Sequence, residues 1–306
     1  MQAQKSTRSS PILAFFVRSL IFGFSFLPLR ISQWIGGGIG ILLWLIPNRL
    51  RDVSRRNVKR CFPELSYEER TSLVRESLSA TGKNTAEAGA MWRWSSNRLE
   101  KLEAGVENEE LLHLGMERGR GVLLLAPHVG NWEYFTYFLI QRYPILSLYR
   151  PPRIAELDTL ILQARQRLGT EMVPATGSGL RTFARALGAG RLVAILPDQE
   201  PLKKHGVFAP FFGSKALTMT LVRSLVRRYD PAVVFAFAER TREGKFYVRF
   251  LPPPEGLGDS DAVRASTQLN LGVEACVRRC PGQYMWSYRR FRTRPPDESS
   301  SGALKS

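Results

Sequence analysis

The sequence predicts an α/β fold, in which a mostly parallel central sheet is flanked by helices. One observation is a smooth apolar run at residues 122–126, which is short enough to be a strand buried on both faces. A second is the regular alternation of strand-like and helix-like segments that follows this run. A third is that polar side chains stand directly after three of the predicted strands, as at the carboxyl edge of an open α/β sheet.

The remaining elements of the sheet region follow from the same pattern. Strands are expected at residues 145–149, 171–173 and 192–196, with an antiparallel pair at 232–240 and 245–251 joined across Glu243 and Gly244. Helices are expected at residues 131–142, 155–168, 178–187 and 216–229, and a last long helix at 259–279, capped by Asp259. The aromatic stretch 208–213 is expected to be a loop that packs on the core or forms a wall for an acyl chain.

Helices are also expected before the first strand. They cover residues 67–82, 84–94 and 107–118, and Ser66 with Glu69 forms a capping box at the start of the first.

The composition describes a basic chain that can bury a substantial core. The protein has 306 residues, 44% of them hydrophobic, and 44 Lys and Arg against 27 Asp and Glu, which gives a net charge of +17. Such a surplus predicts a partner with negative charge: nucleic acid, anionic lipid or an acidic protein. Because no recognition-helix or base-stacking signature is present, no nucleic-acid partner is expected.

The three cysteines indicate a reducing compartment. Cys276 and Cys280 stand at helical spacing, but two thiols without a nearby histidine make a poor metal site. We therefore expect reduced, structural cysteines and no metal.

Residues 1–47 are expected to form a membrane-anchoring helical segment. Two apolar blocks lie at residues 12–29 and 34–46, but Arg18 interrupts the first and the second is short. The segment would therefore either span the bilayer or lie in its interface, with a soluble helical hairpin as the alternative. The glycines at residues 36–40 are expected to serve helix packing.

A basic flank follows this segment at residues 48–60. By the positive-inside rule it lies on the cytoplasmic side, against anionic headgroups. The remaining chain divides into an expected catalytic domain at residues 48–294 and a disordered tail at residues 295–306.

The candidate active site begins where the strand at residues 122–126 ends. His128 stands at the carboxyl end of this strand, and Asn131 caps a helix whose first turn holds Glu133. The spacing predicts a hydrogen bond from His128 to Glu133, which would fix the tautomer of the imidazole and raise its basicity. The backbone N–H groups around Gly130 and Asn131 are candidate donors to an oxyanion. A His-x4-Glu pair also occurs by chance, but His128 alone among the three histidines follows a buried strand.

Arginines follow a second strand end. Arg150 stands after the strand at residues 145–149, where its guanidinium would suit a phosphate or carboxylate. Arg165 and Arg167, on the predicted helix that follows, either share this role or lie on a solvated surface.

A third strand end carries Asp198, Gln199 and Glu200, after the strand at residues 192–196. Asp198 lacks a second carboxylate at metal spacing, so we expect it to position a substrate or an arginine. Gln199 is expected to bind substrate, and the role of Glu200 stays open.

Together these motifs resemble the late acyltransferases of lipid A biosynthesis, within the lysophospholipid acyltransferase-like superfamily. The resemblance rests on HVGNWE after VLLLAP, on YRP and PDQ, on VFAPFFG followed by Thr218, and on PGQYMWSYRRFRTRP near the C-terminus. It covers essentially the whole chain and implies a fold like that of the glycerol-phosphate acyltransferases. The chain lacks the Glu-Gly-x-Arg block of those relatives, which argues against a simple glycerolipid acceptor.

The resemblance implies an O-acyltransferase of the bacterial inner membrane, with its catalytic domain on the cytoplasmic face. In this family the His-x4-Asp/Glu pair is catalytic, which maps onto His128 and Glu133, and its functional Arg and Asp map onto Arg150, Arg165 and Asp198. The expected partners are an acidic acyl-acyl carrier protein, a phosphorylated glycolipid acceptor and the anionic membrane surface. A thioester donor is already activated, so no cofactor is expected.

Two alternatives remain open. One is an acyltransferase of the same superfamily that acts on another membrane acceptor, such as an ornithine or mannoside lipid. The other is a basic membrane-binding protein without catalysis, which would not explain polar clusters at three strand ends.

Overall fold

The computed structural model describes residues 11–149 and 171–295, together with residues 158, 159, 162, 163, 165 and 169. Arg150, Arg167, most of the predicted helix at 155–168 and the tail from residue 296 lie outside the described residues.

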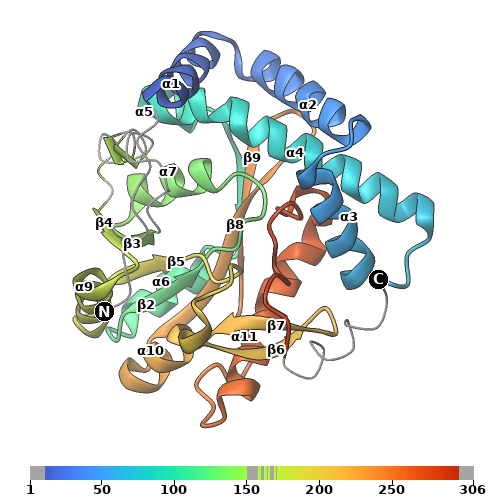
Figure 1. The fold of residues 1–306 in the computed structure, drawn as a ribbon. Helices are drawn as coiled ribbons and strands as arrows, with labels where there is room; N and C mark the ends of the chain where they lie inside the picture. Colours follow the sequence, from blue (N-terminus) through green and yellow to red (C-terminus); the bar gives the residue numbers. More distant parts are fainter. Residues whose placement is uncertain are drawn as a thin grey trace, which may run out of the picture.

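A seven-stranded sheet forms the centre of the molecule (Figure 1). Its order is β1-β9-β8-β2-β5-β3-β4. The strands are β1 (Glu103–Glu107), β2 (Val122–Leu125), β3 (Ile145–Tyr149), β4 (Glu171–Pro174), β5 (Leu192–Ile195), β8 (Ala232–Arg240) and β9 (Phe246–Leu251). The five strands from β8 to β4 pair in parallel, whereas β9 is antiparallel to β8 and parallel to β1. The predicted mostly parallel sheet and its antiparallel pair are confirmed.

Helices cover both faces of this sheet. They are α3 (Arg49–Cys61), α4 (Tyr67–Arg93), α5 (Ser96–Glu100), α6 (Glu110–Glu117), α7 (Trp132–Arg142), α9 (Gly177–Gly188), α10 (Leu221–Tyr229) and α11 (Ala262–Arg279), with short 3-10 turns η1 (Lys203–His205) and η2 (Pro281–Gln283). Strand β2 is buried along its whole length, and its side chains alternate between two cores. Leu123 and Leu125 pack with α9 and α11, and Val122 and Leu124 pack with α6 and α7. Because both faces of β2 are buried, its sequence is a continuous run of apolar residues.

The structure corrects several predicted boundaries. The two helices predicted at 67–94 are the single helix α4, and β1 precedes a helix α6 that is shorter than predicted. Helix α11 is capped by Asp261, whose Oδ1 accepts from the backbone N–H groups of Val263 and Arg264, rather than by Asp259. The capping box of Ser66 and Glu69 and the cap at Asn131 are confirmed.

The predicted aromatic loop is a hairpin of β6 (Gly206–Phe211) and β7 (Ser214–Met219). Phe212 and Gly213 form its two-residue turn, with φ angles of 46° and 72°. Positive φ at both central residues is the geometry that two-residue hairpins favour, although phenylalanine is an unusual occupant. Helix α10 consequently begins at Leu221, after the hairpin, and not at Ala216.

The N-terminal helices α1 (Pro11–Phe26) and α2 (Leu29–Leu45) lie along α4 at one end of the molecule (Figure 1). A Cβ atom on Gly40 would meet the carbonyl oxygen of Leu78 at 2.2 Å, and one on Gly36 would meet that of Gly82 at 2.5 Å. The predicted packing role is confirmed for Gly36 and Gly40, because only glycine permits the two helix backbones to approach so closely, but not for Gly38, where an added Cβ atom would meet no described atom within 4 Å.

Both N-terminal helices expose many large apolar side chains. We call this set the apolar face of α1 and α2: Phe15, Phe16, Leu20, Phe22, Phe26, Ile31, Trp34, Ile39, Leu42 and Leu45. Within the described part of the chain, no single helix combines the length and hydrophobicity needed to cross a bilayer. The pair α2 and α3 meets both conditions together, but with a bend of 80° between them.

Candidate active site

Two neighbouring strands of the sheet bring His128 and Asp198 together. Strands β2 and β5 are parallel and in register, with Leu125 opposite Ile195. A proline follows each strand, and His128 and Asp198 stand at equivalent positions, each three residues beyond the paired ones. The Nδ1 atom of His128 lies 2.8 Å from Oδ1 of Asp198, and the backbone N–H of His128 donates to Oδ2 at 3.1 Å. One carboxylate therefore fixes both the ring and the main chain of this histidine.

The environment of Asp198 keeps it ionised. Burial acts to raise the pKa of this carboxyl, but the charge of His128 and its hydrogen bonds outweigh burial and hold the pKa below the usual range. An ionised Asp198 assigns the proton of the neutral imidazole to Nδ1, so that Nε2 carries the free lone pair. The side-chain amide of Gln199 lies 3.2 Å from Nε2, in a position to donate to it. His128 is thus oriented as a base whose reactive atom faces Gln199.

The predicted hydrogen bond between His128 and Glu133 is wrong. Oε2 of Glu133 accepts from Trp92 Nε1 at 2.9 Å and from Arg165 Nε at 3.2 Å, while Oε1 pairs with the other arm of the same guanidinium. Burial acts to raise the pKa of Glu133, but Arg165 and these hydrogen bonds prevail and hold it below its ordinary value. The carboxylate of Glu133 therefore pairs with Arg165, whereas the carboxylate of Asp198 is hydrogen-bonded to His128.

The predicted role of the Gly130 and Asn131 N–H groups as oxyanion donors is also wrong, because both groups already donate to carbonyls of the protein. The N–H of Gly130 donates to the carbonyl of Gln283 at 3.0 Å, and that of Asn131 donates to the carbonyl of Ala238 at 2.8 Å. Gly130 adopts φ +65°, and a Cβ atom there would lie 1.9 Å from the carbonyl oxygen of Ala238. These two residues hold the loop after β2 against β8, which requires glycine at this close approach.

A buried polar network, not foreseen from the sequence, lies behind this loop. The carboxylate of Glu87, which is fully buried, accepts from Asn131 Nδ2 at 2.6 Å and from Gln33 Nε2 at 2.8 Å, and it pairs with Arg240. Asn84 Nδ2 also donates to the carbonyl of Gly130 at 2.8 Å. The only signal in the sequence is a lone Glu87 among small residues of α4, which does not disclose partners far away along the chain.

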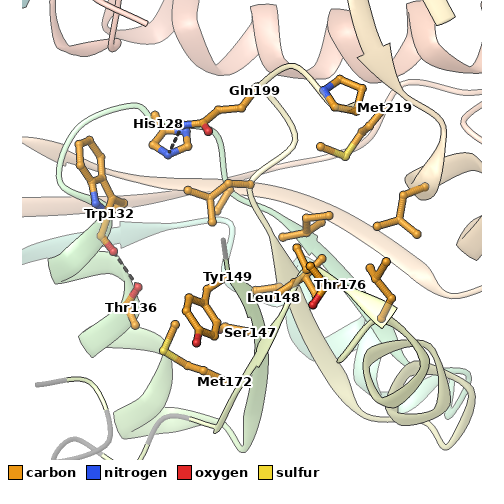
Figure 2. Close-up of a pocket in the computed structure, with 18 of the residues that line it drawn as sticks. His128, Trp132, Thr136, Ser147, Leu148, Tyr149, Met172, Thr176, Gln199 and Met219 are labelled. Atoms are coloured by element: carbon orange, nitrogen blue, oxygen red, sulfur yellow. Dashed lines mark hydrogen bonds between the residues drawn. The ribbon is translucent and has the colours of Figure 1, made fainter. Parts of the chain in front are cut away.

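A cavity of about 660 Å³ opens beside His128. Its polar lining includes His128, Gln199 and Arg165. Most of its remaining wall is apolar, with Phe135, Leu139, Leu148, Met172, Leu180 and Met219 among the lining residues. Figure 2 shows His128 and Gln199 at one end of this cavity, and Tyr149 and Met172 at the other. An elongated apolar substrate would fit with its reactive end at His128.

Glu200, whose role the sequence left open, holds the C-terminal segment. Its buried carboxylate accepts from the backbone N–H of Thr293 at 3.0 Å and from Arg292 Nε at 3.2 Å.

Of the predicted site residues, the structure brings together His128, Asp198, Gln199 and Arg165. Among the described residues, no group of three or more His, Cys, Asp or Glu could hold a metal ion.

Known proteins resemble this chain over most of its length. The profile of the bacterial lipid A biosynthesis acyltransferase family matches residues 1–293. The chain is 29% identical to the lipid A biosynthesis lauroyltransferase of Escherichia coli K12 over 271 residues, which cover 88% of each chain. It is 28% identical to the palmitoleoyltransferase of the same strain over 275 residues, 90% of this chain and 89% of the relative. An acyltransferase of Haemophilus influenzae is 29% identical over 283 residues, 90% of this chain and 88% of the relative. With a family profile that spans nearly its whole length, the chain belongs to the bacterial lipid A biosynthesis acyltransferases.

Proposed function

We propose that this protein transfers a fatty acyl group from an acyl-acyl carrier protein to the hydroxyl of a 3-hydroxyacyl chain on a lipid A precursor. The family and the relatives named for lauroyl and palmitoleoyl transfer support acyl transfer in lipid A biosynthesis. The observation that carries the proposal is the His128–Asp198 pair at one end of a largely apolar cavity.

In the proposed mechanism, Nε2 of His128 takes the proton of the acceptor hydroxyl as its oxygen attacks the thioester carbonyl. A carbon–oxygen bond forms, the carbon–sulfur bond then breaks, and the imidazolium returns its proton to the departing thiolate. Asp198 stabilises the imidazolium and keeps the reactive tautomer, as the carboxylate of a hydrolase triad does, but no enzyme nucleophile is needed. Because a thioester is already activated, the step requires no metal or nucleotide.

Arg165 and Gln199 supply the polar contacts in this proposal. Arg165 lines the cavity, and its pairing with Glu133 fixes the guanidinium there, so Glu133 acts as a positioning residue. Gln199 occupies the place beside Nε2 that the acceptor hydroxyl would take, and its amide would then turn to bind substrate. With the N–H groups of Gly130 and Asn131 engaged, the side chains of Arg165 and Gln199 replace them as candidate oxyanion donors.

The surface properties support membrane attachment and an acidic donor. The apolar face of α1 and α2 would enter the interface of the bacterial inner membrane from the cytoplasmic side. The net charge of +17 would attract the acidic carrier protein, the phosphorylated glycolipid and anionic headgroups.

A transfer assay with detergent-solubilised protein tests the reaction. Acyl-carrier-protein thioesters of different chain length, and the matching coenzyme A thioesters, would be offered with a Kdo-bearing lipid A precursor, and products weighed by mass spectrometry. We expect a mass gain of one acyl group, with the carrier-protein thioester preferred. No gain on this acceptor, but a gain on an ornithine or mannoside lipid in the same assay, would contradict the proposed acceptor and keep the acyl transfer.

A further inference from the structure

A second cavity lies away from the active site. It has a volume of about 570 Å³ and shares no lining residue with the cavity beside His128. Its walls come from α2, from α4 and from the turn between β8 and β9, which reaches up to these helices (Figure 1). Arg30 Nη1 donates to the carbonyl of Arg242 at 3.0 Å, and Gln33 Nε2 donates to that of Gly244 at 2.8 Å. These contacts fix the turn against α2, so the cavity is a built feature of the fold.

Four cationic side chains line this cavity: Arg30, Lys83, Arg240 and Arg242. Arg240, at its inner end, is neutralised by the buried Glu87. For Arg30, Lys83 and Arg242, the described part of the chain provides no ion pair within 4.0 Å. The exposed Glu243 lies on the same turn and acts on Arg30 and Arg242 only through space. The cavity therefore carries an excess of positive charge.

Burial and, after it, this excess of positive charge lower the pKa of Lys83. Its side chain is half-buried, and burial followed by the charge of Arg240 lowers its pKa, with Arg30 acting in the same direction and Glu87 against them. A bound anion would offset the repulsion among these cations and hydrogen-bond to donors that face the cavity.

The cavity also borders the apolar face of α1 and α2. Trp34 belongs to both, and its side chain is 79% exposed. A tryptophan beside basic side chains and a large apolar surface is typical of the level at which lipid headgroups meet the hydrocarbon.

We propose that this cavity is a second binding site of the protein, which takes a phosphate group of the kind that an anionic membrane lipid carries in its headgroup. The inference rests on the proposed membrane attachment but not on the acyl-transfer chemistry. It assigns Lys83 and Arg242 as the principal ligands, because both line the cavity without a carboxylate partner among the described residues, whereas Arg30 already donates to the carbonyl of Arg242.

Binding of vesicles by the full-length protein tests this site. Wild type, Lys83→Gln/Arg242→Gln and the charge-matched Arg227→Gln/Arg228→Gln would be compared on phosphatidylcholine vesicles with and without phosphatidylglycerol. Arg227 and Arg228 are exposed on α10, at the other end of the molecule in Figure 1. We expect the cavity variant to lose about thirtyfold of the affinity for the anionic vesicles and to keep its affinity for the neutral ones. Equal losses in the two double variants would overturn the proposal, because they would indicate general attraction.

A second experiment, with water-soluble ligands, identifies the source of the phosphate. Dihexanoyl-phosphatidylglycerol below its micelle concentration and inorganic phosphate would each be titrated by calorimetry into wild type and the cavity variant. Saturable binding of the lipid alone, lost in the variant, would assign a headgroup site, and equal binding of phosphate would assign the phosphate group itself. Absence of saturable binding by either ligand, or binding unchanged in the variant, would refute the site. Acyl transfer is not the readout, so either result leaves the acyltransferase proposal to its own test.

Discussion

The two carboxylates near His128, those of Asp198 and Glu133, have different partners. Asp198 contacts the imidazole and the main chain of His128, whereas Glu133 is committed to Arg165 and Trp92. In the proposed mechanism Asp198 affects the proton transfer directly, and Glu133 affects it only through the place of the guanidinium.

The ion pair of Glu133 and Arg165 should make the free energy of unfolding depend on pH. Glu133→Gln keeps the shape of the side chain but removes the negative charge that pairs with the mostly buried guanidinium of Arg165. We expect the free energy of unfolding at pH 7 to fall by about 3 kcal/mol. Because the pKa of Glu133 is depressed in the folded state, its stabilisation is present above about pH 4.3 and is lost as the pH falls through the lower folded value.

Urea unfolding of wild type and Glu133→Gln at several pH values between 7 and 3 measures this effect. The difference between the two proteins should shrink below about pH 4.3. Glu64→Gln is the control, since Glu64 is exposed, and its difference from wild type should stay near zero throughout. A Glu133→Gln difference that grows on acidification would contradict the depressed pKa.

At the scale of elements, the sequence predicts the framework of the site better than its contacts. Buried strands appear as short apolar runs, and their carboxyl ends are marked by His128 and by Asp198, so both residues could be predicted to lie at one edge of the sheet. That they are neighbours depends on the order of the strands, in which β5 lies next to β2. Strand order is set by packing across the whole chain, and for that reason Glu133, nearer in sequence, was the wrong partner.

The hairpin of β6 and β7 and the continuity of α4 were not predicted, because their residues are not typical of these structures. The hairpin of β6 and β7 contains Pro210 and turns at Phe212, neither of which is typical of a strand pair. The break predicted between residues 82 and 84 is absent, because Gly82 is the place where α2 packs, and tertiary contact replaces the lost helix propensity.

The close contact of α2 and α4 predicts a sharp difference between two glycines of one helix. Gly40→Ala would place a methyl group against the main chain of α4, and we expect a loss of about 1–3 kcal/mol in the free energy of unfolding. Gly38 is exposed, and a methyl group added there would meet no described atom within 4 Å. Gly38→Ala should therefore raise stability by up to about 1 kcal/mol through helix propensity. Thermal unfolding of both variants measures the contrast, and similar shifts would contradict the packing of these helices.

At the scale of the whole molecule, the apolar face and the surplus of positive charge lead to the proposed attachment at a membrane surface. The exposed residues cluster on α1 and α2, whereas other exposed large apolar side chains, such as Leu114 and Leu271, lie on α6 and α11. A cluster of this size on a protein surface marks an interaction site.

This clustering predicts which apolar residues matter for lipid binding. Phe26→Ser/Trp34→Ser should weaken binding to neutral vesicles at least about tenfold, because each large apolar side chain contributes about 1.5–3 kcal/mol when fully buried. Leu114→Ser/Leu271→Ser removes apolar surface elsewhere and should bind as wild type does. Co-sedimentation with phosphatidylcholine vesicles measures both, and equal weakening would argue against attachment through α1 and α2.

The role of His128 as the base is tested most sharply by the rate of acyl transfer to the lipid A precursor in single-turnover conditions. His128→Ala and Asp198→Asn would be compared with wild type, and with His113→Ala as a histidine variant outside the cavity. We predict a fall of about 10²–10⁴-fold in the two site variants and an unchanged rate in the control. A His128→Ala rate equal to that of wild type would contradict the proposed mechanism, because acyl transfer would then need another base.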